Sequence, residues 1–455
     1  VMDNLYADCH WFFVPARLCW DSWPNLMGER ASLDDDPSNY SVPQGTYSLQ
    51  NGRGNMVDYL GLPIGETNVT ISFNELPMRA IQLIWNEWYR DQNLQEPIAV
   101  NTGDSGQSWT NYALRRRNKR KDYLTSALPW PQKGEPVFLP LGTQAPIQGI
   151  GTTNGIFPTS NQSYTETDGN TRTYDHSVEI ANATIGVEGT AAASGIPKIF
   201  ADLTSATAAT INDIRTAFQI QRLLERDARS GTRYVEVILA HYNVRSPDFR
   251  LQRPEFLNGS STMININPVA ATVAQETVPQ GNLAAVGTGL LKSGFSASFT
   301  EHGYIIGLLS IRADYTYQRG MDRMWSRQTR YDFYWPTLAH LGEQEIKNKE
   351  IFVDGTATDE ETWGFQERFG EYRFKQGLIT GRFRSVDPLS LDAWHLSEDF
   401  DTLPPLGPSF VTENPPVNRV VAVPAEPKFL LDAWHKLECS RPMPVYSVPG
   451  LVDHF

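Results

Sequence analysis

A run of basic side chains between residues 115 and 121 is the first place in this sequence where chemistry could occur. Its six basic members are Arg115, Arg116, Arg117, Lys119, Arg120 and Lys121. The whole chain is acidic, with 39 Lys and Arg against 52 Asp and Glu, and removing six positive charges from the net −13 would leave −19. Like charges at this density repel one another and need a counter-charge, which an acidic patch of another subunit or a phosphate backbone would supply. A solvated loop is the plainer alternative. The run lacks the apolar face of a membrane-binding helix.

A second candidate is the stretch MWSRQTRYDFYWP, which mixes arginine with aromatic side chains. Such a mixture can stack on single-stranded bases, or it can form a subunit interface, where both residue types are enriched. We favour the interface. The candidate residues are Arg323, Trp325, Arg327, Arg330, Tyr331, Tyr334 and Trp335.

Catalytic and metal-binding motifs are missing from the sequence. HLGEQE (340–345) lacks the paired histidines of a zinc protease helix, and GIGTTNG (149–155) has neither the lysine nor the following helix of a phosphate loop. LDAWH occurs at 391–395 and 431–435, where an extended chain would point the His and Asp side chains to opposite faces, so packing is the better interpretation. We therefore expect no enzyme, no metal and no cofactor.

The elements that must position these residues are mostly strands. Extended, apolar segments predict strands at 6–15, 69–73, 136–141, 174–180, 232–242, 303–317, 418–423, 427–434 and 444–448. Segment 303–317 reads as a strand buried on both faces. Helical spacing of apolar residues predicts one helix over 77–92 and a second from Thr204 or Ser205 to Gly231. Short strands among long connections indicate a β-sandwich or barrel with large insertions.

Cysteine usage and hydropathy set further bounds. Three cysteines with no CxxC pair favour a reducing compartment and no disulfide framework. No apolar run reaches the length of a membrane-spanning helix. The abrupt start at Val1 leads us to expect that an N-terminal segment precedes this sequence. Residues 151–200 are different in character, because Gly, Ser, Thr and Asn make up 23 of the 50, which predicts an exposed insertion.

Several long blocks resemble the major capsid proteins of the Microviridae, small tailless phages with circular single-stranded DNA, and their gokushovirus branch most of all. The blocks include IWNEWYRDQNLQ, KRKDYLTSALPWPQKG, TINDIRTAFQIQRLLERDARSGTRY, SFTEHGYIIGLLSIRADYTYQRG and RPMPVYSVPGLVDHF. The resemblance runs from about residue 2 to residue 455 and is lowest over 144–200.

This resemblance implies a single domain over 1–455 with an eight-stranded antiparallel jelly roll. Sixty copies would form a T=1 icosahedral shell around the genome. Within such a shell, the charge density of the basic run in an acidic chain suggests a position on the inner surface against DNA, and a position between subunits against acidic residues of a neighbour is the alternative. Residues 144–200 would be the hypervariable insertion that builds a threefold protrusion and contacts a host receptor. The candidate host-contact residues are Asn161, Tyr164, Thr165, Asp168 and Asn170.

The resemblance also implies a location and further partners. The protein would reside in the virion, after assembly in the bacterial cytoplasm, with a DNA pilot protein and a small basic internal protein. The alternative from another class is a jelly-roll glycan-binding module or glycosidase, which the tryptophans and acidic residues suggest. A glycosidase would need two carboxylates in an open cleft.

Overall fold

The computed structural model describes five long stretches of the chain and a few short strands. The described residues are 2–29, 36–137, 147–148, 162–165, 171–174, 200–201, 211–245, 252–270, 272 and 283–441. Within them, small antiparallel sheets are joined by long connections and a few helices, which confirms the predicted β class.

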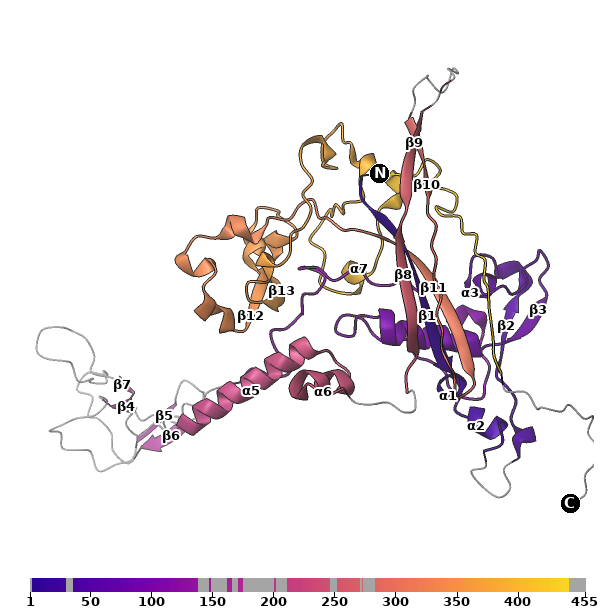
Figure 1. Ribbon diagram of the computed structural model, residues 1–455. Coiled ribbons are helices and arrows are strands. Elements are labelled where there is room, and N and C mark those ends of the chain that lie inside the picture. Colours follow the sequence, from indigo (N-terminus) through magenta and orange to yellow (C-terminus); the bar gives the residue numbers. More distant parts are fainter. Residues whose placement is uncertain are drawn as a thin grey trace, which may run out of the picture.

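The central sheet has three antiparallel strands in the order β11-β1-β8 (Figure 1). They span β1 Leu5–Pro15, β8 Glu255–Met263 and β11 Gly303–Ala313. Phe12 stands opposite Ile306 on one neighbour and Phe256 on the other. Gly307 lies under the Trp11 ring, where a Cβ would come within 2.7 Å of the ring, so the close pairing requires glycine.

The other sheets of the described residues are two-stranded antiparallel ribbons. They pair β2 Gln44–Ser48 with β3 Thr70–Asn74, β9 Asn265–Ala270 with β10 Leu283–Thr288, β12 Glu343–Lys347 with β13 Thr362–Glu367, β4 Ile147–Gln148 with β7 Phe200–Ala201, and β5 Gln162–Thr165 with β6 Thr171–Tyr174. The β9–β10 ribbon continues the line of β8 beyond the end of the sheet (Figure 1).

One helix packs against the central sheet near the C-terminal end of β1. Helix α4 spans Leu76–Ile84 and continues as a π-helical turn over Trp85–Tyr89, so the predicted helix at 77–92 is confirmed with small changes at both ends. Its buried Leu76 and Ile84 pack against Phe12 and Val14 of β1. The short helices α1 Ala16–Cys19, α2 Trp23–Leu26 and α3 Met56–Tyr59 lie nearby (Figure 1).

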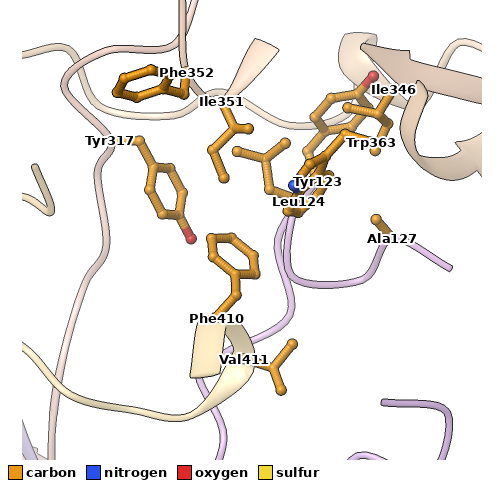
Figure 2. Packing of buried hydrophobic residues seen from close by; sticks show 10 residues of the cluster. All are labelled: Tyr123, Leu124, Ala127, Tyr317, Ile346, Ile351, Phe352, Trp363, Phe410 and Val411. Atoms are coloured by element: carbon orange, nitrogen blue, oxygen red, sulfur yellow. The ribbon is translucent and has the colours of Figure 1, made fainter. Parts of the chain in front are cut away.

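A second core forms where segments distant in sequence meet (Figure 2). Its ten buried residues are Tyr123, Leu124, Ala127, Tyr317, Ile346, Ile351, Phe352, Trp363, Phe410 and Val411. The last two belong to the short helix α7 Pro408–Val411. The indole N–H of Trp363 donates to the Pro404 carbonyl at 2.7 Å, which satisfies the polar atom of this ring inside an apolar cluster.

The segment predicted as a strand at 232–242 is a helix. Helix α5 spans Ile211–Ser230, Gly231 ends it with φ +92°, and α6 follows at Tyr234–Tyr242. The Glu236 carboxylate accepts from the Arg233 N–H at 3.1 Å, and Asn243 closes the far end in the left-handed region. The β-branched residues of this run favoured a strand, and capping together with packing against α5 outweighed them. The predicted start of the first of these helices, at Thr204 or Ser205, lies outside the described residues.

Other strand predictions also need correction. Residues 418–423 hold the end of a 3₁₀ turn (Val417–Arg419), and 427–434 form no strand, because neither segment finds a pairing partner within the described chain. In β11 the side chains of Ile305 and Leu309 are exposed in the single chain, so this strand is not buried on both faces. Residues 136–137 are irregular, and the rest of 136–141, residues 175–180, 149–155 and 444–448 lie outside the described residues.

Candidate functional site

The basic run at 115–121 is an extended segment held by main-chain hydrogen bonds to the last residue of α7 and to the chain that follows it. The N–H of Lys119 donates to the Val411 carbonyl at 2.8 Å, and the N–H of Glu413 donates to the Arg117 carbonyl at 2.9 Å. The side chains of the run therefore leave a fixed backbone, and they reach two different environments.

Lys119 turns into the protein. Its side chain is only 2% exposed, and its Nζ lies 2.6 Å from Oε2 of Glu398. The rings of Tyr315 and Phe410 lie 4.7 and 4.6 Å from the same nitrogen. Burial lowers the pKa of Lys119 and raises the pKa of Glu398, since each charge loses water, while the pairing opposes both shifts.

Arg117 is also paired inside its own chain. Its guanidinium lies 3.1 Å from Asp8 of β1, donates to Ser310 at 2.8 Å, and covers the Tyr89 ring at 5.2 Å. Burial raises the pKa of Asp8, but a hydrogen bond from Ser261 and the nearby arginine charges outweigh it, so the pKa of Asp8 is lowered overall. Asp8 therefore stays ionised as the partner of Arg117.

The remaining four cations of the run stay at the surface. Arg115 and Arg116 are exposed, and the side chains of Arg120 and Lys121 are 43% and 55% exposed. Each of the last three has some support from its own chain, since Arg116 donates to Asn414, Arg120 lies 3.4 Å from Asp314, and Lys121 pairs with Asp91. For Arg115, no such contact is found among the described residues. A pocket of about 200 Å³ lies beside the run, between it and the π-helical turn.

Most of the counter-charge of the run thus comes from within the chain. Sequence reasoning considered a neighbouring subunit or a phosphate backbone, and it missed these acids. The partners of Arg117 and Lys119 lie 109 and 279 residues away along the chain, so spacing gave no signal of them. Sequence reasoning also missed Glu413, a buried acid with several hydrogen-bond partners. Its carboxylate accepts hydrogen bonds from Arg312 at 3.1 Å and from the Tyr315 hydroxyl at 3.2 Å.

The arginine and aromatic stretch forms a surface of exposed rings on short 3₁₀ turns at Arg323–Ser326 and Arg330–Asp332. We call it the aromatic surface, and its exposed apolar members are Met324, Trp325, Tyr331, Phe333, Tyr334 and Trp335. Trp325 is 72% exposed.

The three arginines hold the aromatic surface in place. Arg323 points inward to Glu350 at 2.9 Å and to the Glu345 carbonyl at 2.6 Å. Arg327 pairs with Glu371 at 3.2 Å. The guanidinium of Arg330 lies over the rings of Tyr331 and Trp335, 5.3 and 5.6 Å from their centroids. The segment that carries the rings is therefore anchored by ion pairs of Arg323 and Arg327, while the rings stay open to solvent.

The predicted host-contact residues are only partly described. Tyr164 and Thr165 lie in β5, opposite Arg172 and Thr171 of β6. Asn161, Asp168 and Asn170 lie outside the described residues.

Two searches for other kinds of site gave negative results within the described stretches. No three His, Cys, Asp or Glu side chains gather there as metal ligands. Glu343 of the HLGEQE motif instead pairs with Arg229 of α5. No helix in those stretches has both the length and the apolar character needed to cross a membrane.

Comparison with known proteins bears on whether the chain is a capsid protein or a glycan-binding module or glycosidase. The sequence profile of the family described as "Capsid protein (F protein)" of phages matches residues 1–451. The chain belongs to this phage capsid protein family. The predicted resemblance to the Microviridae is thereby confirmed, and so is its consequence that the chain is a structural protein and not an enzyme. The match therefore favours the capsid interpretation over the alternative of a glycan-binding module or glycosidase.

Three curated capsid proteins are similar in sequence to this chain over almost its full length. Capsid protein VP1 of Bdellovibrio phage phiMH2K is 45% identical over 472 residues, which cover 100% of this chain and 87% of the relative. Capsid protein VP1 of Chlamydia phage 1 is 38% identical, covering 99% and 87%. Capsid protein VP1 of Spiroplasma virus 4 is 35% identical, covering 99% and 86%. A capsid protein assembles with copies of itself and is part of the virion.

Proposed function

We propose that sixty copies of this capsid protein form a T=1 icosahedral shell around a circular single-stranded DNA genome. In this proposal each subunit is built on an eight-stranded jelly roll, of which the β11-β1-β8 sheet is one part. The DNA pilot protein and the small basic internal protein would complete the particle in the bacterial cytoplasm.

The observation that supports this proposal best is the aromatic surface. Monomeric soluble proteins rarely leave large contiguous apolar patches in water, and such patches usually mark interfaces. Here six large apolar side chains from one short stretch are exposed in a single copy. The ion pairs of Arg323 with Glu350 and of Arg327 with Glu371 fit an interface, because a segment that is already held in place loses little conformational entropy on binding.

A reconstruction of purified particles by electron microscopy tests the proposal. We expect sixty copies related by icosahedral symmetry, with the aromatic surface buried between copies and residues 144–200 on the outside at the threefold axes. A different copy number would overturn the T=1 shell. An insertion on the inner surface would overturn its proposed contact with a host receptor.

DNA contact is a second part of the proposal, and it now rests on four residues of the run. Arg117 and Lys119 are held by Asp8 and Glu398, so we assign the DNA contact to Arg115, Arg116, Arg120 and Lys121. Of the four, Lys121 lines the pocket beside the run, together with Trp88, Tyr89 and Arg90, and such a combination of rings and cations suits a single-stranded base with its phosphate.

Replacing these four residues with glutamine should reduce the genome content of purified particles. Four charges lost from a single-strand contact would reduce the slope of log affinity against log salt by up to about 3 per subunit. The measurement is the ratio of DNA to protein in particles, together with that salt slope. A matched control removes four exposed cations elsewhere, at Arg53, Arg215, Arg226 and Lys375. If both variants retain the same amount of DNA as the wild type, the run does not contact the genome.

A further inference from the structure

Residues 427–441 are an extended segment with few contacts to the other described residues of their own subunit. Residues 427–441 have no secondary structure, and no backbone hydrogen bond joins them to any other described segment. Every one of them is exposed. Figure 1 shows this segment in yellow, running down beside the sheet toward the C-terminal end.

The exposed side chains of this segment are unusually apolar for a solvated tail. They include Phe429, Leu430, Leu431, Trp434 and Leu437, with Leu430 98% and Trp434 85% exposed. Full burial of such a side chain stabilises a protein by about 1.5–3 kcal/mol. Because neighbouring residues of an extended chain point to opposite sides, Leu430 and Leu431 need apolar contacts on two sides. One flat face of the same subunit cannot cover both.

Contacts between this segment and the rest of the described chain are few. His435 packs edge-on against Trp11 of β1, with ring centroids 5.9 Å apart. Lys428 donates to the Pro424 carbonyl and Lys436 pairs with Glu438, so both of these contacts stay local. The segment therefore passes the sheet at one ring and leaves its leucines and Trp434 uncovered.

We propose that residues 427–441 form an arm that binds an adjacent copy of this chain. The partner is a second copy because a capsid protein assembles with copies of itself, so that surface is always within reach. Fifteen extended residues span about 50 Å, enough to cross onto a neighbour. Their free N–H and C=O groups can pair with an exposed strand edge, such as that of β8 or β11. The charges of Lys428, Asp432, Lys436, Glu438 and Arg441 nearly cancel, so an acidic neighbour does not repel the arm.

Photo-crosslinking tests the arm directly. A benzophenone amino acid in place of Trp434 keeps an aromatic ring at the position and bonds to whatever covers it on irradiation. We expect crosslinked dimers, seen as a band of twice the subunit mass, from intact particles and not from dissociated subunits. Crosslinks that join the arm only to its own chain in intact particles would overturn the proposal.

The unmodified chain provides a second measurement. Cys439 lies on the arm and is exposed in the single subunit, whereas Cys19 is buried. Alkylation of Cys439 by N-ethylmaleimide should be at least about tenfold slower in particles than in dissociated subunits, and equal rates would count against the arm. The proposal of an arm depends on the proposal that the protein assembles into a shell, and different results would refute each of them. Absence of particles would refute the shell, while particles with a freely reactive Cys439 would refute the arm alone.

Discussion

Replacing Trp325, Tyr331 and Trp335 with serine should abolish particle formation and leave the subunit folded. These rings are exposed in the single copy, so their loss removes little from the core. At an interface, truncating a central aromatic side chain typically costs 2 kcal/mol or more. Three such losses amount to about 6 kcal/mol at each contact, which lowers the association constant by about 10⁴-fold.

The control for this variant keeps the rings and changes their polar atoms. Phenylalanine at the same three positions retains most of the apolar area, and particles should form at close to the normal yield. Size-exclusion chromatography and electron microscopy report assembly, and circular dichroism reports the folded state. If the serine variant forms particles normally, the aromatic surface is not an interface between subunits.

The local sequence pattern correctly predicted strand β1 and helix α4. Their apolar residues are buried in the core on the face that this pattern indicates. Alternation and apolar content place β1, and the helical spacing of Met78 and Ile81 places α4. The segment at 232–242 carried the pattern of a strand, and its helix depends on Glu236, on Asn243 and on packing against α5. The apolar stretch 427–434 has strand character but finds no partner within the described chain, and a strand cannot form without one.

The basic run also has features that could not be predicted from the sequence, because they depend on residues far away along the chain. Its charge density is visible in the sequence, but the division between buried and exposed members is not. Lys119 and Lys121 are two residues apart, yet one is surrounded by Glu398 and aromatic rings and the other reaches the surface. This division depends on acids and rings brought in from distant parts of the chain, about which a single sequence carries no signal.

The variant Lys119→Ala should lose about 3–5 kcal/mol of unfolding free energy, the usual effect of removing one partner of a buried ion pair. The change leaves Glu398 buried without its counter-charge and removes the cation from the rings of Tyr315 and Phe410. Arg115→Ala removes one charge from the same run at an exposed position, and it should alter stability by no more than about 0.5 kcal/mol. Denaturant unfolding of dissociated subunits measures both.

The pH dependence separates the lost ion pair from a simple loss of packing. Burial raises the pKa of Glu398 above its usual 4.5, and removing Lys119 raises the pKa further. A carboxyl whose folded-state pKa is raised favours the folded state below the ordinary pKa, and this advantage is lost as pH rises through the raised value. The deficit of Lys119→Ala should therefore grow from about pH 4 toward neutrality, and the double variant Lys119→Met, Glu398→Leu should recover most of it at pH 7. A deficit that is the same at both pH values, or a double variant no better than the single one, would show that Lys119 acts by filling space and not by its charge.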